Sequence, residues 1–250
     1  RQPNGASSAD RANQADRQSS ANSEEASKQG FNFYLYRRKQ QSEDVNTIQE
    51  LREQLTKTIS DLHGRRWCEG TGGNFSVVVQ RDPIHLLMAP SGINKGRVEP
   101  AQLVIVDEHQ HVIEGRGQAS AETTLHVEII KRLECRAVLH THSIDATVLS
   151  DHFAEQAKIR LEGWEMLKGL KGIISHATSI DIPIVSNNQN IKELSQTVRP
   201  YLSSTLPGLL VAGHGLYAWG NSLAEAQRHV EILEFLFSVV LQKKLLESNS

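Results

Sequence analysis

Two histidines stand at the end of an apolar run in the stretch Ala137-Val138-Leu139-His140-Thr141-His142-Ser143. Because alternate side chains of a strand point to the same face, His140 and His142 can aim at one point. A second apolar run, residues 209–212, leads to His214. Three histidines with an open coordination position suit zinc, and iron, manganese or cobalt can use the same ligands. The pattern therefore predicts a three-histidine metal site. A plainer interpretation stays open, in which these histidines only end a strand and serve a glycine-rich turn.

Composition and charge narrow the classes of function. The chain has 250 residues, 38% of them hydrophobic, which allows one or two domains with a sizeable core. Its formal net charge is -2, so charge gives no reason to expect nucleic acid or a membrane as a partner. The sequence has no apolar run near the roughly 20 residues that span a bilayer. Cys68 and Cys135 are far apart, and we expect reduced thiols in a cytoplasmic protein.

The first 45 residues differ in composition from the rest of the chain. Residues 1–45 are mainly Ser, Ala, Asn, Gln and charged residues. Such a segment buries too little apolar surface to offset the entropy lost on ordering, so we predict a disordered N-terminal extension. The folded catalytic domain is expected over residues 46–250.

Helical and strand patterns alternate along residues 46–250. Apolar residues spaced by three and four predict helices, and short apolar or β-branched runs predict strands. We expect helices at 46–64, 123–133, 143–149, 163–170, 191–202 and 222–246, and strands at 75–79, 84–88, 103–106, 111–113, 137–142, 182–185, 209–212 and 216–219. This order predicts an α/β fold with helices on both faces of a sheet, and the short turns favour a mixed or mostly antiparallel sheet.

Three stretches combine small and polar residues at predicted strand ends. They are Gly72-Gly73-Asn74, Pro90-Ser91-Gly92 and Ala119-Ser120-Ala121. Exposed backbone N–H groups and hydroxyls of this kind can hold a phosphate, and Lys95 can add a positive charge. Each stretch alone is better explained as an ordinary turn, but together they make phosphate binding a reasonable hypothesis.

Two glutamates are candidates for proton transfer. Glu122 opens the predicted helix at 123–133, where an acidic side chain is favourable in any case because of the helix dipole. Glu165 follows Trp164, and partial burial beside the indole would raise its pKa and suit it to acid/base work. Composition alone favours the other interpretation, an exposed helical position for Glu165.

Five stretches together resemble the class II aldolase/adducin family, over residues from about 47 to 246. They are GTGGNFS (70–76), APSGINKG (89–96), SAETTLH (120–126), HTHS (140–143) and GHGLYAWG (213–220). Residues 164–169 and the last of these stretches are most similar to the dehydratases of the family. The resemblance implies a three-layer α/β/α sandwich around a mixed, mostly antiparallel sheet, in a homotetramer with active sites between subunits.

The resemblance also implies a role for each candidate residue. One Zn²⁺ per subunit is expected on the histidines, and a phosphorylated ketose on the phosphate-binding residues. The metal ligands would be His140, His142 and His214, and the phosphate would be held by Asn74, Ser91, Gly92 and Ser120, with Lys95 nearby. Glu165 matches the acid/base of the dehydratases, whereas Glu122 matches the acid/base, or a fourth metal ligand, of the sugar-phosphate aldolases.

The expected reaction is zinc-dependent loss of water from a ketose phosphate in methionine salvage, with Glu165 favoured over Glu122. A sugar-phosphate aldolase or a pentose-phosphate epimerase is the alternative, because both begin with the same metal and phosphate chemistry. A non-catalytic scaffold, as in the adducin branch, is less favoured, because this chain has all three histidines.

Overall fold

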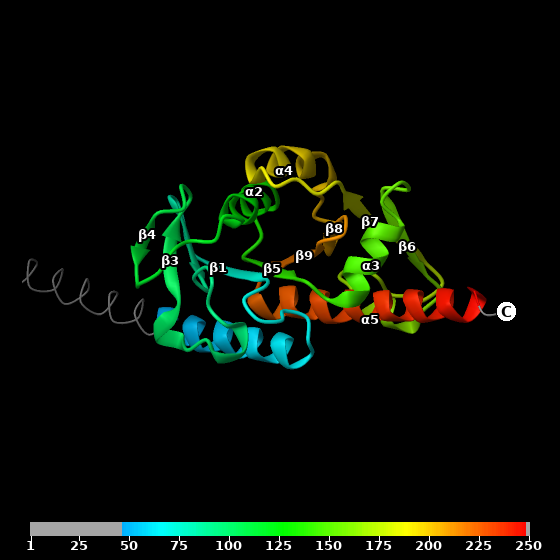
Figure 1. Cartoon of the computed structure of the whole chain (residues 1–250), viewed down its shortest axis with the longest axis horizontal. Coiled ribbons are helices and arrows are strands. Elements are labelled where there is room, and N and C mark those ends of the chain that lie inside the picture. The colour runs from blue at the N-terminus through cyan, green and yellow to red at the C-terminus, as the bar shows by residue number, and fades with distance from the viewer. Residues whose placement is uncertain (1–46, 249–250) are drawn as a thin grey trace, which may run out of the picture. The chain divides into compact units, whose positions relative to one another are not determined.

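A computed structural model describes residues 47–248, so the expectation for residues 1–45 lies outside the described residues. The chain divides into Arg1–Gln49 and Glu50–Ser250, and the sheet with its helices belongs to the second unit (Figure 1). The strands are β1 (Asn74–Arg81), β2 (Ile84–Met88), β3 (Val104–Asp107), β4 (Val112–Glu114), β5 (Ala137–Thr141), β6 (Lys158–Glu162), β7 (Ser179–Val185), β8 (Gly208–Val211) and β9 (Gly215–Gly220).

The helices precede, separate and follow these strands. Residues 47–64 form the first helix. The others are α2 (Thr123–Leu133), α3 (Ile144–His152), α4 (Ile191–Val198) and α5 (Leu223–Ser248), with short 3₁₀ helices η1 (Lys95–Arg97), η2 (Pro100–Gln102), η3 (Glu165–Gly169) and η4 (Arg199–Tyr201).

The strands form one nine-stranded sheet in the order β4-β3-β2-β1-β5-β9-β8-β7-β6. The β7–β8 pair is parallel, and the other neighbouring pairs are antiparallel. The prediction of a mixed, mostly antiparallel sheet is therefore confirmed. β5 is the central strand, and all five of its residues are buried, as its continuous apolar sequence requires of a strand covered on both faces.

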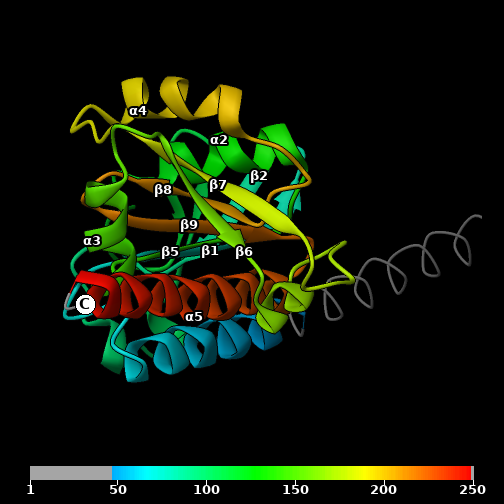
Figure 2. The ribbon, with the colours of Figure 1, turned by 90° about the vertical axis from the view of Figure 1, so that its right-hand side faces the viewer.

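Helices cover both faces of the sheet, as predicted. Figure 2 shows α2 and α4 on one side and α5 with the helical residues 50–64 on the other. The buried side chains of α5 recur at intervals of three and four, which places them on the face that packs against the sheet. They include Leu223, Ala226, Val230, Leu233, Phe237 and Val240.

Three elements differ from the sequence-based expectation. β6 was not predicted; its sequence alternates buried Ile159 and Leu161 with exposed charged residues, as an edge strand does. The expected helix at 163–170 is the 3₁₀ helix η3. The expected helix at 191–202 ends as α4 at Val198, and the 3₁₀ helix η4 begins at Arg199, because Pro200 has no backbone N–H to continue the α-helix.

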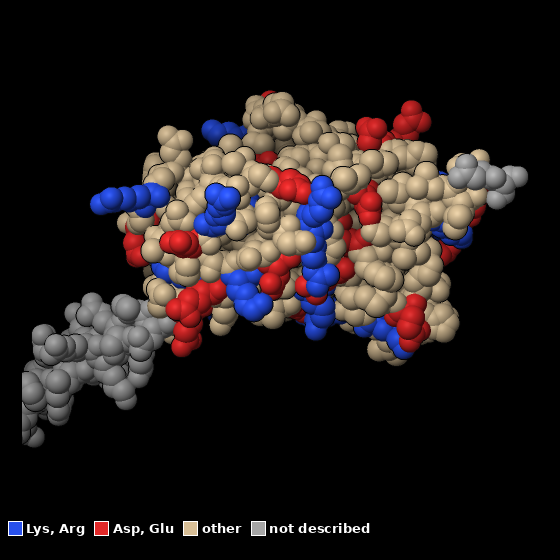
Figure 3. Space-filling model, turned by 60° about the horizontal axis from the view of Figure 1, so that its bottom comes forward, with Lys and Arg blue, Asp and Glu red and all other residues tan. Residues whose placement is uncertain are grey.

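The surface of the described residues carries mixed charge on the face that Figure 3 presents, where acidic and basic side chains are interspersed. No helix within residues 47–248 combines the length and the apolar character that crossing a bilayer requires.

Candidate metal centre and active site

The three histidines predicted as ligands meet at one end of the central strands. His140 belongs to β5, His142 follows its last residue, and His214 lies in the turn between β8 and β9. Antiparallel pairing of β5 with β9 sets Thr141 opposite Leu216, which brings the start of β9 to the end of β5. A Cβ atom on Gly215 would stand 2.0 Å from the Thr141 carbonyl oxygen, so this close approach requires glycine.

The ring nitrogens of the three histidines converge. The Nε2 atom of His140 lies 3.3 Å from that of His214 and 2.7 Å from that of His142. Two nitrogens bound to a tetrahedral zinc ion are separated by about 3.3 Å. His140 donates from Nδ1 to the Leu216 carbonyl oxygen at 2.9 Å, which leaves its Nε2 lone pair for a ligand.

Electrostatics suit this cluster to a cation. Burial lowers the pKa of His140 well below its usual value, with His142 and His214 adding to the effect. Burial also lowers the pKa of His142 to about 4. Neutral imidazoles that turn their lone pairs toward one point are the ligand set of a divalent metal. His140, His142 and His214 are the group of possible metal ligands found among the described residues, and they fit such an ion.

Glu122 completes one side of the cluster. Its Oε2 atom is 3.5 Å from His140 Nε2, and its Oε1 atom is 3.6 Å from His214 Nε2. Asn74, which lies opposite His140 in the β1–β5 pair, donates its side-chain amide to Glu122 Oε2. Glu122 therefore stands where it can act as a fourth ligand or as a base beside the metal.

The glycine-rich loop before β1 packs against the histidines. A Cβ atom on Gly72 would be 3.1 Å from His142 Nδ1, and one on Gly73, whose φ is +79°, would be 2.7 Å from the His140 carbonyl oxygen. The His142 N–H donates to the Trp67 carbonyl oxygen at 2.7 Å. Glycines thus let this loop approach the metal centre closely.

The other two candidate phosphate stretches are tied to this region. The Ser91 N–H donates to the Gln118 carbonyl oxygen, next to the Ser120 stretch. Ser91 and Gly92 are exposed, and Gly92 has a φ of +74°. Ser120 is buried and accepts a hydrogen bond from the Glu122 N–H at 3.2 Å. The structure therefore gathers all three stretches near the end of the central strands that carries the histidines.

Lys95 has a different environment from the one expected. It is 2% exposed, and its Nζ atom donates to the carbonyl oxygens of Thr71 and Ile93 at 2.9 and 3.2 Å. Its backbone N–H also donates to the Gly70 carbonyl oxygen. Lys95 thus holds its own loop against the glycine-rich loop, and its charge helps to lower the pKa of His142.

Glu165 lies away from the histidine cluster of its own chain. Along β7, Ser179 pairs with Glu162 of β6, just before η3, and Val185 pairs with Val211, just before His214. Six residues of strand separate these two ends, about 20 Å. Figure 2 shows the arrowhead of β6 pointing away from α3, which follows the histidines. The Glu165 segment therefore lies at the opposite end of the sheet.

Of the two environments considered for Glu165, the structure shows the exposed one. Its side chain is 67% exposed rather than buried beside Trp164, and it pairs with Lys168 and with His176. The hydrogen bond from Lys168 lowers its pKa, where burial would have raised it. Glu165 is thus ionised and accessible.

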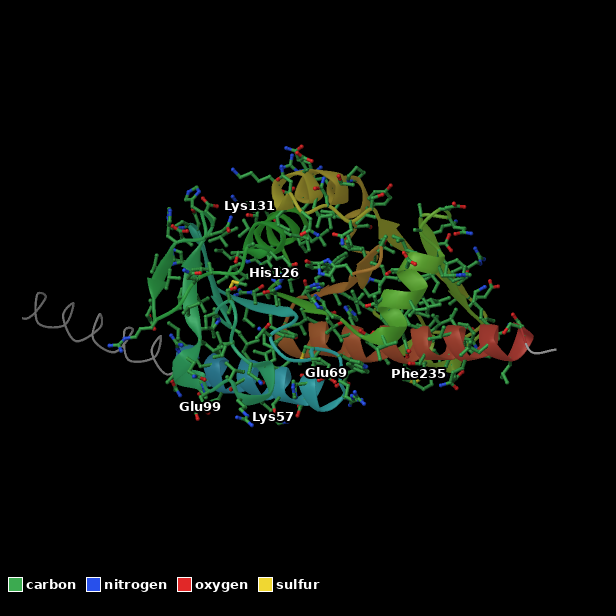
Figure 4. All side chains as sticks on the ribbon, viewed as in Figure 1. Lys57, Glu69, Glu99, His126, Lys131 and Phe235 are labelled. Atoms are coloured by element: carbon green, nitrogen blue, oxygen red, sulfur yellow. The ribbon has the colours of Figure 1, made fainter. Side chains whose placement is uncertain are left out.

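Sequence reasoning missed the residues that support the histidines. Tyr217 is fully buried and stacks on His140 with ring centroids 3.9 Å apart. His126 meets Tyr217 edge to face, and Figure 4 shows it on the sheet side of α2. Glu234 of α5 accepts hydrogen bonds from Thr141 and Ser143, which flank His142. A glutamate inside the apolar run 232–237 was the available signal for Glu234.

Fold and site together define a class II aldolase-type metal centre, and the comparisons agree. Residues 53–241 match the family described as Class II Aldolase and Adducin N-terminal domain. The chain belongs to this family, as its motifs indicated. The family is generally dependent on a divalent metal.

Two curated relatives are similar to this chain over most of its length. Methylthioribulose-1-phosphate dehydratase of Yersinia pestis (strain Pestoides F) is 46% identical over 189 residues, 74% of this chain and 83% of that protein. The protein of the same name from Pectobacterium carotovorum subsp. carotovorum (strain PC1) is 43% identical over 205 residues, 79% of this chain and 98% of that protein.

Solved structures share the fold. The l-fuculose-1-phosphate aldolase from Thermus thermophilus has a TM-score of 0.65 at 24% identity, covering 80% of this chain and 98% of its own. A sugar-phosphate aldolase from Thermotoga maritima has a TM-score of 0.59 at 20% identity, covering 80% and 96%. The predicted α/β fold of the class II aldolases is thereby confirmed.

Proposed function

We propose that the chain dehydrates 5-methylthioribulose 1-phosphate to 2,3-diketo-5-methylthiopentyl 1-phosphate, a step of methionine salvage. The observation that carries this proposal is the pairing of an intact metal centre with the relatives' shared activity. The three converging Nε2 atoms and the relatives at 43% and 46% identity over most of the chain both support it.

The proposed metal is zinc, one ion per chain, held by His140, His142 and His214. When bound there, the ion supplies Lewis-acid polarisation of the substrate's C2 carbonyl group. Glu122 lies within 3.6 Å of two of these Nε2 atoms, so its carboxylate adds negative charge beside the ion. His214 is 20% exposed on its side chain, and substrate has access to the cluster from that side.

The phosphate group is proposed to lie against the three gathered stretches. Exposed Ser91 offers its hydroxyl and exposed Gly92 its backbone N–H, and the buried Lys95 contributes a positive charge. Asn74 and Ser120 are both engaged with Glu122. The Asn74 amide therefore orients the Glu122 carboxylate, whereas Ser120 holds the Glu122 backbone N–H, and both line the same end of the site.

The acid/base residue of the proposed mechanism is Glu165. Its ionised carboxylate removes the proton from C3, and the electron pair left at C3 expels the C4 hydroxyl, which leaves as water once the same carboxyl returns the proton. The enol product then tautomerises to the diketone. A positioned carboxylate in such a role is typically worth about 10²–10⁴-fold in rate.

Glu165 can fill this role for the metal centre of a neighbouring copy. The sheet holds it about 20 Å from the cluster of its own chain by strand length, and its side chain is exposed. An oligomer that joins the η3 end of one subunit to the histidine end of another completes each site. We propose a homotetramer, the assembly that the family resemblance implies.

A cytoplasmic location completes the proposal. Cys68 and Cys135 are free and buried, and burial raises the pKa of each thiol to about 12. Thiols in this state are unreactive and need no oxidising compartment.

The test is to mix zinc-loaded protein with 5-methylthioribulose 1-phosphate and to follow the mixture by NMR. Loss of water to the diketone phosphate is the expected result. Unchanged substrate, with zinc measured in the protein, would contradict the proposed reaction.

Aldolase chemistry is the second candidate, because Glu122 rather than Glu165 stands beside the histidines of its own chain. Carbon–carbon cleavage products in the same NMR experiment would select it, and an epimerised pentose phosphate would select an epimerase.

A further inference from the structure

Glu234 is a buried carboxyl group behind the metal-binding strand. It lies on α5, is 1% exposed, and accepts hydrogen bonds from Thr141 Oγ1 at 2.8 Å and Ser143 Oγ at 2.5 Å. Each carboxyl oxygen has one of these donors. Figure 4 labels the next residue of the helix, Phe235, below α3.

A carboxyl group at the position of Glu234 would be unfavourable without polar partners. Its neighbours on the helix, Leu233 and Leu236, are fully buried in the core. Burying a carboxyl group among apolar side chains is unfavourable unless hydrogen bonds compensate for the lost water. Burial raises the pKa of Glu234 to about 7, and nearby Asp145 adds to the effect. An apolar side chain at this position would avoid that unfavourable free energy. The presence of a carboxyl group is therefore explained by the two hydrogen bonds that it accepts.

Its two partners are the residues on either side of His142. Alternation along β5 turns His140 toward the metal centre and Thr141 toward the opposite face, where α5 packs. Ser143 caps α3 by accepting a hydrogen bond from the Ala146 N–H at 3.0 Å. Glu234 therefore joins the end of the strand and the start of the next helix at one point.

His142 is thus held from two sides. Its backbone N–H donates to the Trp67 carbonyl oxygen at 2.7 Å, and its neighbours in the chain are fixed by Glu234. A ligand's supporting hydrogen bonds set its direction toward the metal, and losing such a support typically costs about 10–100-fold in metal affinity.

We infer that Glu234 is a positioning residue for the metal centre, which fixes the Thr141–Ser143 segment and so aims the imidazoles of His140 and His142 at the ion. The inference rests on the proposed metal centre and holds whichever reaction that centre catalyses. It assigns Glu234 no contact with substrate.

Metal affinity of the full chain tests the inference directly. Zinc is titrated against a competing chelator for wild type, Glu234→Ala and Glu234→Gln, and the visible spectrum of the cobalt-loaded forms is recorded. Glu234→Ala should bind zinc about 10–100-fold more weakly and show an altered cobalt spectrum. Glu234→Gln should lose less, because its amide can accept from one hydroxyl and donate to the other.

Ser238→Ala is the matched control. Ser238 lies one turn further along α5 and donates to Asp145 of α3, so its loss removes a contact between the same two helices without touching Thr141 or Ser143. Zinc affinity should stay at the wild-type value. If Glu234→Ala does not fold, Thr141→Val keeps the β-branched shape, removes one of the two hydrogen bonds, and should still weaken zinc binding.

Two outcomes would overturn the inference. One is wild-type zinc affinity and an unchanged cobalt spectrum in Glu234→Ala, or in Thr141→Val if that variant replaces it. The other is an equal loss of affinity in Ser238→Ala, which would indicate a general effect of helix packing. A wild-type chain that binds zinc but leaves 5-methylthioribulose 1-phosphate unchanged would contradict the proposed function and leave this inference standing.

Discussion

The histidine cluster and the η3 segment are built in opposite ways. His140 is fully buried on the central strand of the sheet, and its ring is fixed by a backbone carbonyl oxygen and by stacking on Tyr217. Glu165 stands on a short 3₁₀ helix after an edge strand, is mostly exposed, and is paired with two other exposed side chains.

The contrast is consistent with the two different origins proposed for the metal ligands and for the acid/base group. A metal centre needs ligands within a few tenths of an ångström of their places, and buried contacts within one chain provide that precision. An exposed carboxylate has few contacts to hold it in place. It gains a defined environment when a second subunit covers it, which is the arrangement proposed for Glu165.

Removal of a ligand should have the largest effect. His142→Ala leaves two histidines, so zinc affinity should fall by more than the roughly 10–100-fold that loss of a supporting residue costs. Metal analysis after dialysis measures this. His152→Ala, at an exposed position of α3, should keep full occupancy. A fully occupied His142→Ala variant would remove this residue from the ligand set.

Loss of the acid/base group should leave the metal in place. Glu165→Gln should lower kcat by about 10²–10⁴-fold while the zinc content stays at the wild-type level, because η3 lies at the other end of the sheet. Glu162→Gln, in the same segment and exposed, is the control and should turn over normally. Near-normal kcat in Glu165→Gln would transfer the role to Glu122.

Mixed oligomers should show that the two halves come from different chains. Equal co-expression of His142→Ala and Glu165→Gln subunits leaves each chain with one defect. If sites form between subunits, random assembly gives both intact groups at about one quarter of the sites, and turnover should recover to that fraction. Recovery close to zero in verified mixed oligomers would place both groups in one chain.

The smallest expected effect concerns the pH profile. The hydrogen bond from Lys168 lowers the pKa of Glu165, so the base stays ionised to lower pH than a free glutamate. Lys168→Met should therefore raise the pKa of Glu165 and move the acid limb of kcat/KM to higher pH. Lys171→Met, which loses only an ion pair to Glu225, should leave the limb in place. An unshifted limb in Lys168→Met would mean that Lys168 does not face Glu165 in the active oligomer.

The sequence was sufficient to predict that His140, His142 and His214 come together, and most of the fold. His140 and His142 were recognisable because strand alternation fixes their common face, and His214 because its apolar run ends in a glycine turn. The bounds of α2 were predicted to the residue. These features depend on the spacing of residues that are close together in the chain, and a single sequence shows that spacing.

Features that depend on contacts between residues far apart in the chain could not be predicted from local patterns. Trp164 next to Glu165 suggested a desolvated carboxyl, yet adjacency in the chain does not say which side chain an aromatic ring covers. β6 was missed because only two of its five residues are apolar, so its alternating pattern is too short to stand out in the sequence. Glu234 is separated from Thr141 by more than ninety residues, and a helix pattern cannot reveal a partner on another element.

The central place of β5 has a further consequence for how the molecule opens. Amide hydrogens of a strand with neighbours on both edges and helices on both faces exchange with solvent mainly through global unfolding, whereas an exposed 3₁₀ helix after an edge strand exchanges through local fluctuations. Backbone protection at Leu139 and His140 therefore reports on the free energy of the whole domain. The η3 segment can fray and re-form many times while the ligand-bearing strand stays closed.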